Sequence, residues 1–135
     1  MMHSAVEAAT KIAEKINVER PKVVGITVLT SEAKNDNIQP LVLERAQFAK
    51  KAGLDGVVTS SQEAKFIRKE FGPDFLIVTP GVRPSGTDSQ DQKRTATPQE
   101  AIQNGSDYLV IGRPILKAKN PLETVKKILE EINQA

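Results

Sequence analysis

The sequence predicts an α/β fold in which one helix precedes four βα units, which is half of a (β/α)8 barrel. Apolar runs typical of strands alternate with segments of helical periodicity, and such alternation predicts a parallel sheet with right-handed crossovers. The chain has 135 residues, close to half of the roughly 250 residues of a complete barrel. The last two strands each run into a turn with glycine, arginine and proline, at the place where such barrels bind phosphate.

The first half of the chain contains two helices and two strands. Residues 4–17 carry apolar residues at helical spacing. Residues 23–29 form a continuous apolar run, which predicts a strand covered on both faces. Pro40 begins the second helix and Gly53 ends it, and residues 56–59 are the second strand.

The second half continues the alternation. Ser60 begins a helix in a capping-box pattern with Glu63, and residues 75–78 are the third strand. Residues 84–96 are polar and aperiodic, a loop of a length that usually serves a function. Thr97 begins the next helix as an N-cap followed by proline.

The last βα unit leaves the predicted sheet open. Gly105 ends a helix, residues 108–111 are the fourth strand, and Asn120 begins the final helix. Four parallel strands cannot close into a barrel, so two edges keep unpaired backbone groups. We therefore expect the chain to form a homo-oligomer through these edges or to pair with a missing partner half.

Composition indicates a single globular domain over residues 1–135. Hydrophobic residues make up 39% of the chain and charged residues 27%. A net charge of +2 and an aromatic content of 4% argue against a nucleic-acid partner. No apolar run approaches the roughly 18 residues of a membrane span, and no signal pattern is visible, so we expect a cytoplasmic protein without a membrane partner. The lack of cysteine and the single His3 argue against a metal site.

Two strand ends carry the predicted chemistry. Arg83 follows the third strand and Arg113 follows the fourth, each in a turn that contains glycine and proline. Glycine lets backbone N–H groups approach a ligand closely, and the guanidinium fork matches two phosphate oxygens. The pair predicts a site for a small phosphorylated ligand.

Four segments carry a resemblance to a known family: Thr79-Pro-Gly-Val-Arg-Pro84, Asp91-Gln-Lys-Arg94, Thr97-Pro-Gln-Glu-Ala101 and Gly105-Ser-Asp-Tyr-Leu-Val-Ile-Gly-Arg-Pro-Ile115. In this order along the chain, they resemble the orotidine 5′-phosphate decarboxylase family. Residues 24–31 are similar to the fifth strand of that family. The resemblance covers nearly the whole chain but only strands five to eight of the family's barrel.

The resemblance implies an activity and a phosphate site. The family converts orotidine monophosphate to UMP and CO2 in pyrimidine biosynthesis, with no metal or organic cofactor. Arg113 would bind the 5′-phosphate, with the backbone N–H groups of Gly112 and Arg113 beside it. The expected partner is therefore a nucleoside monophosphate.

Four further positions receive roles from the same resemblance. Gln92 would close over the phosphate and touch the pyrimidine, while Pro80 and Arg83 would shape the mouth after the third strand of this chain. Thr30 would hydrogen-bond the pyrimidine ring. Structural roles are the alternatives: a strand cap for Thr30, a solvated position for Gln92, and a loop or helix-end arginine for Arg83 and Arg113.

The family's catalytic signature, Asp-x-Lys-x-x-Asp, does not occur in this sequence. The nearest string, Asp91-Gln92-Lys93, lacks the second aspartate and lies in the long loop. The lysine that would protonate C6 is therefore missing, and we expect weak phosphate binding without catalysis. The first residues, Met1 to Ala5, look like the middle of the family's fourth helix, so we expect a truncated or cut chain.

Three other functions stay open at this point. The chain could be a non-catalytic half-barrel whose main property is self-association, or one half of a split enzyme that needs its N-terminal half in trans. Another phosphate-binding barrel, such as a hexulose-phosphate synthase-like protein, is a neighbouring possibility. The Thr79–Pro84 and Asp91–Arg94 strings argue against that last reading.

Overall fold

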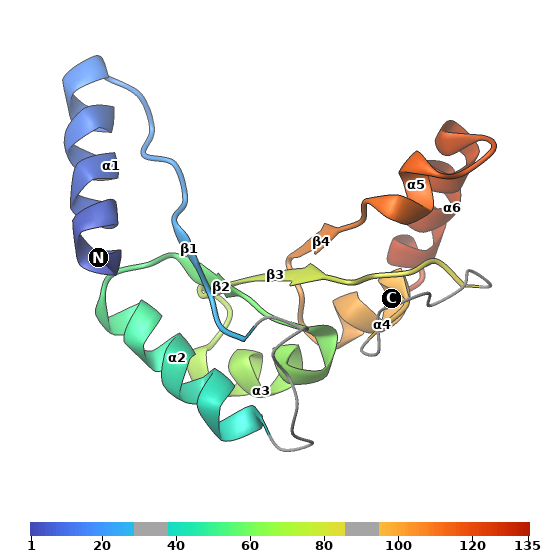
Figure 1. The fold of residues 1–135 in the computed structure, drawn as a ribbon, viewed down its shortest axis with the longest axis horizontal. Helices are drawn as coiled ribbons and strands as arrows, with labels where there is room; N and C mark the ends of the chain where they lie inside the picture. Colours follow the sequence, from blue (N-terminus) through green and yellow to red (C-terminus); the bar gives the residue numbers. More distant parts are fainter. Residues whose placement is uncertain (29–37, 86–94) are drawn as a thin grey trace.

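A computed structural model describes residues 1–28, 38–85 and 95–135. Its four strands form one parallel sheet in the order β1-β2-β3-β4, with consecutive strands as neighbours (Figure 1). The strands are β1 (Val24–Ile26), β2 (Gly56–Val58), β3 (Leu76–Pro80) and β4 (Tyr108–Val110). The alternation of strands and helices confirms the predicted α/β half-barrel architecture.

Helices separate the strands as the sequence pattern predicts. They are α1 (Met2–Ile16), α2 (Gln39–Lys51), α3 (Ser61–Phe71), α4 (Pro98–Gln103), α5 (Arg113–Leu116) and α6 (Pro121–Asn133). Only α5 is unexpected, because four residues are too short to show helical periodicity. Figure 1 shows α2, α3 and α4 along one side of the sheet, with α1 and the α5/α6 pair at its two ends.

The hydrophobic core lies between the sheet and its helices. Side chains on a strand alternate between the two faces, so Ile77 and Thr79 of β3 point to the helices and are fully buried. On β2, Val57 occupies the same layer. The helices add further buried residues to this cluster: Val42, Ala46, Ala49, Ala64, Ile67 and Phe71.

The opposite face of the sheet is open, which contradicts the prediction that residues 23–29 are covered on both sides. Ile26 is 63% exposed, Tyr108 58% and Val110 52%. The prediction was wrong because every helix that packs on the sheet lies on the other face. The continuous apolar run is typical of a strand buried on both sides, but this chain supplies only one of the two layers.

Two aspartates tie the N-terminal edge of the sheet together. Each lies immediately before a strand and accepts hydrogen bonds from an arginine and from a backbone N–H of the neighbouring strand segment. The partners are Arg20 and Val23 N–H for Asp55, and Arg68 and Ile77 N–H for Asp107, at 2.6–3.0 Å. These contacts lie at the N-terminal ends of the strands, the end that contributes to stability in barrels of this kind, whereas ligands bind at the carboxyl ends.

The predicted N-cap at Thr97 is confirmed, and Thr97 also forms a capping box with Glu100. The Thr97 side chain accepts a hydrogen bond from Glu100 N–H, and the Glu100 carboxylate accepts one from Thr97 N–H. Ser60 is the N-cap of α3, as predicted, but the predicted capping box was wrong, because the Ser60 hydroxyl bonds the Glu63 carboxylate instead of a backbone N–H. Both side chains are buried there, so they pair with each other.

Candidate functional site

The carboxyl ends of β3 and β4 lie at the same level of the sheet. Pro80, the last residue of β3, pairs with Val110, the last residue of β4. Arg83 and Arg113 each follow three residues later. The parallel register therefore brings the two predicted arginine turns to one edge, at the end of the strands where α/β proteins bind their ligands.

The turn after β3 is closed by backbone contacts. Gly81 adopts a φ of +77°, a left-handed conformation that glycine tolerates without strain. Val82 bridges to Ala96, and Arg83 N–H donates to the Ala96 carbonyl at 2.9 Å. The Arg83 side chain is only 7% exposed, and its Nη1 donates to the Val82 carbonyl at 3.0 Å. This geometry fits the expected role of Arg83 in shaping the mouth and also fits its structural alternative.

The turn after β4 is more accessible. Gly112 is exposed and caps α5, and a side chain added there would meet no atom within 4 Å. Open space at this position lets a ligand approach the backbone. Arg113 is the first residue of α5 and is half-buried. The chain therefore presents one guanidinium beside an open backbone turn.

Pro80 ends β3 on the open face of the sheet and is half-buried, so it lies beside this edge. Thr30 and Gln92 lie outside the described residues, as does the Asp91–Arg94 segment. Of the six predicted site residues, the structure therefore groups Pro80, Arg83, Gly112 and Arg113 at the carboxyl ends of β3 and β4.

A row of buried threonines underlies the carboxyl edge of the sheet and was not predicted. Thr27, Thr59 and Thr79 follow residues that pair across the first three strands. The Thr79 and Ser106 hydroxyls share a hydrogen bond of 2.6 Å, and the Thr27 hydroxyl donates to the Val58 carbonyl at 2.9 Å. A signal was present in the sequence, since each of the first three strands carries a threonine directly after a β-branched apolar residue, at Ile26, Val58 and Val78.

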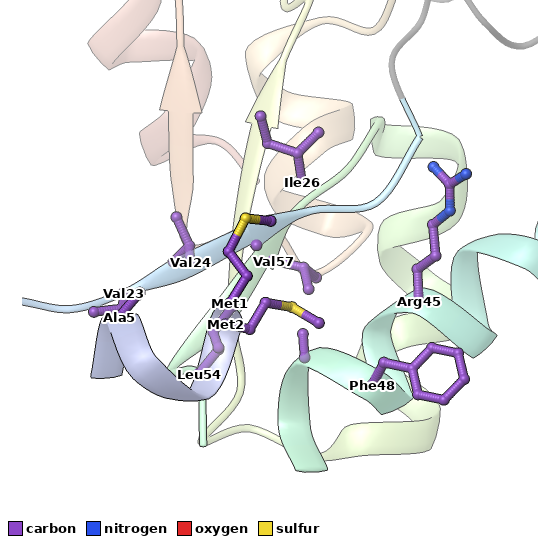
Figure 2. Close-up of a pocket in the computed structure, with 12 residues that line it drawn as sticks. Met1, Met2, Ala5, Val23, Val24, Ile26, Arg45, Phe48, Leu54 and Val57 are labelled. Carbon is purple, nitrogen blue, oxygen red and sulfur yellow. The ribbon is translucent and has the colours of Figure 1, made fainter. Parts of the chain in front are cut away.

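An apolar cavity lies away from the arginine turns. It has a volume of about 520 Å³ and lies between the start of α1, the edge strand β1 and α2 (Figure 2). Apolar side chains from these three elements line it, together with Leu54 and Val57, and Arg45 is the charged residue. A pocket of this composition does not match a phosphate, so the candidate site is not assigned to it.

Within residues 1–28, 38–85 and 95–135, no helix has the length and apolar character of a membrane span. In the same part of the chain, no three His, Cys, Asp or Glu side chains gather where they could ligate a metal.

Comparison with known proteins points to one family. Residues 1–128 match the model of the orotidine 5′-phosphate decarboxylase / HUMPS family. An orotidine 5′-phosphate decarboxylase of Geobacter sp. (strain M21) is 48% identical over 98% of this chain and 58% of its own length. That of Vibrio parahaemolyticus is 44% identical, over 93% and 57%. The chain thus spans little more than half the length of these relatives.

Solved structures agree with the sequence comparison. The crystal structure of orotidine 5′-phosphate decarboxylase from Lactobacillus acidophilus superposes with a TM-score of 0.78 at 35% identity, covering 98% of this chain and 58% of that one. The enzyme from Pyrococcus horikoshii gives a TM-score of 0.61 at 25% identity, covering 92% and 55%.

Proposed function

This chain belongs to the orotidine 5′-phosphate decarboxylase / HUMPS family, and from this premise we propose that it is the phosphate- and pyrimidine-binding half of an orotidine 5′-phosphate decarboxylase. In this proposal residues 1–135 form one domain that corresponds to strands five to eight of the parent barrel. The observation that carries it is the Pro80–Val110 register, which brings both arginine turns to the ligand-binding edge. A cytoplasmic location goes with this metabolic role.

The proposed ligand is a nucleoside monophosphate. Arg113 binds the 5′-phosphate through its guanidinium, and the open turn at Gly112 admits the phosphate to the backbone N–H groups. Pro80 and Arg83 shape the neighbouring mouth. Thr30 and Gln92 supply pyrimidine contacts, a role that rests on the family resemblance alone.

We propose that the isolated chain binds but does not decarboxylate. The family signature Asp-x-Lys-x-x-Asp is not found in residues 1–135, so the chain has no counterpart of the lysine that would protonate C6. Binding energy from a remote phosphate accelerates a reaction only when it is used at the reacting carbon. An N-terminal half supplied in trans would provide the missing carboxylates and lysine.

A titration with UMP tests the binding proposal. We expect a dissociation constant in the millimolar range, which corresponds to about 4 kcal/mol. Arg113→Ala removes the guanidinium and should weaken binding at least about 10-fold, because charge-assisted contacts are the stronger ones. Lys117→Ala removes an exposed cation one turn further on and serves as the control. NMR shifts that stay flat at millimolar UMP would contradict the proposal.

An activity assay tests the proposal that the isolated chain does not decarboxylate orotidine monophosphate. The absorbance of orotidine monophosphate should stay constant with the chain alone and fall when an N-terminal half is added. Turnover by the chain alone would show that the missing lysine is dispensable.

The open sheet face supports a second proposal, self-association into a homo-oligomer. Parallel sheets occur almost only with both faces covered, and here Ile26, Tyr108 and Val110 lie exposed on one face. In the described sheet, β1 and β4 each have one paired neighbour only. A second copy could cover the face and pair both edges, with β4 of each copy beside β1 of the other. The molar mass in solution tests this proposal.

A further inference from the structure

The C-terminal helix α6 contacts both arginine turns of the candidate site. It packs against α5, whose first residue is Arg113. In the last turn of α6, the two carboxylate oxygens of Glu131 accept hydrogen bonds from Ser85, at 3.0 Å from its N–H and 3.1 Å from its hydroxyl. Ser85 lies two residues beyond Arg83. One helix therefore connects the segment after β3 to the segment after β4.

Other contacts hold α6 and the Arg83 segment in place. Gln99 on α4 donates from its side chain to the Gln134 carbonyl, the residue that caps α6, at 3.0 Å. The bridge from Arg83 N–H to the Ala96 carbonyl, at 2.9 Å, closes the turn at its base. In addition to these contacts, the Glu131 side chain fixes the outer end of the Arg83 turn by binding Ser85.

We infer that Glu131 is a positioning residue for anion binding: by holding Ser85, it sets the position of the Arg83 turn relative to Arg113. The inference rests on the proposed phosphate site. Glu131 itself is an anion, so its direct electrostatic effect on a phosphate is repulsive. Positioning and direct charge therefore predict opposite signs when the charge is removed, which makes the two separable.

The test compares Glu131→Gln with Glu130→Gln. Both variants remove one negative charge from adjacent positions of α6, but only Glu131 contacts Ser85, and Glu130 is exposed. UMP is titrated into the full chain by NMR. We expect Glu131→Gln to weaken binding about 5-fold, since a neutral amide offers Ser85 only one oxygen. Glu130→Gln should leave affinity unchanged or slightly higher.

Ser85→Ala tests the same Glu131–Ser85 contact from its other partner. It removes the hydroxyl contact and keeps the N–H contact, so binding should weaken less than in Glu131→Gln. In the double variant the two effects should not add, because both changes act on one interaction. In ligand-free protein, amide exchange at Ser85 should be faster in Glu131→Gln than in Glu130→Gln.

Each outcome separates this inference from the proposed function. Wild-type protein that binds no UMP contradicts the proposed function and the positioning role that depends on it. Wild-type binding with equal affinities of Glu131→Gln and Glu130→Gln contradicts the positioning role alone. Tighter binding by Glu131→Gln than by Glu130→Gln would assign Glu131 a direct repulsive effect and would also overturn the inference.

Discussion

Asp55 shows how one side chain connects two strands at the N-terminal edge of the sheet. Burial disfavours its charge and acts to raise the carboxyl pKa. The hydrogen bonds from Arg20 and Val23 N–H, together with the charges of Arg20 and Lys22, outweigh burial and hold the pKa of Asp55 below its ordinary value. Ionised Asp55 is therefore favoured more strongly in the folded chain than in the unfolded one.

This shift predicts an acid-dependent loss of stability. Asp55 titrates at a lower pKa when folded, so its contribution is complete above the unfolded pKa, about 3.9, and disappears as the pH falls through the folded value. We expect Asp55→Asn to lose about 1–2 kcal/mol of unfolding free energy at pH 7. The difference in unfolding free energy between wild type and Asp55→Asn should become smaller below about pH 4. Urea unfolding between pH 7 and pH 3 measures the loss at pH 7 and its decrease in acid.

Asp74→Asn is the control for this measurement, because Asp74 is exposed near the same edge of the sheet. It should change the unfolding free energy by less than about 0.5 kcal/mol. If the difference in unfolding free energy between Asp55→Asn and wild type stays constant over the whole pH range, the charge of Asp55 is not the cause of the stability loss.

At the scale of elements, the pairing of β2 with β3 depends on Gly56. A Cβ at Gly56 would lie 2.1 Å from the Leu76 carbonyl oxygen and 2.5 Å from the Leu76 Cβ. Leu76 is the direct partner of Gly56 in the register. The obstructing atoms belong to or adjoin the backbone of a central strand, so they cannot move away as the end of a long side chain could.

Gly56→Ala should therefore be severely destabilising, by about 3 kcal/mol or more. Gly112→Ala is the matched control, since Gly112 has a negative φ and open space where the methyl group would go. We expect that variant to stay within about 1 kcal/mol of wild type. Thermal unfolding followed by circular dichroism compares the two. Equal melting temperatures for both variants would contradict the steric argument.

At the scale of the whole molecule, the described helices leave one face of the parallel sheet uncovered. Helices bury one face, while Ile26 and Val110 remain more than half exposed on the other. Apolar surface of this kind on a parallel sheet favours association, because burial of apolar area is the dominant driving force for it. On α1, Ile12 and Ile16 are also exposed.

A charge on the open face should prevent self-association. We expect wild-type protein to have twice the monomer mass by light scattering, and Ile26→Lys to raise the dissociation constant about 100-fold or more, since an unpaired buried charge is costly. Leu122→Lys is the control, because Leu122 is similarly exposed, at 67%, but lies on α6 away from the sheet face. A monomeric wild-type chain would contradict the homo-oligomer proposal.

Local patterns in the sequence were sufficient for the order of strands and helices and for most helix starts. Turn chemistry placed Thr97 and Asn120 as N-caps, and both side chains accept the expected backbone hydrogen bond. The two arginine turns were found in the same way, because glycine, proline and arginine after an apolar run are visible within a few residues. The parallel arrangement then followed from the alternation of elements.

What the sequence by itself determined is the identity and order of the elements, because side-chain period and turn residues act over a few positions. The tertiary structure alone decided which sheet face is covered and which distant side chains meet. Glu131 and Ser85 lie 46 positions apart, and Arg68 and Asp107 lie 39 apart. No local pattern encodes such contacts, since they exist only after the strands have paired and the helices have packed on one side of them.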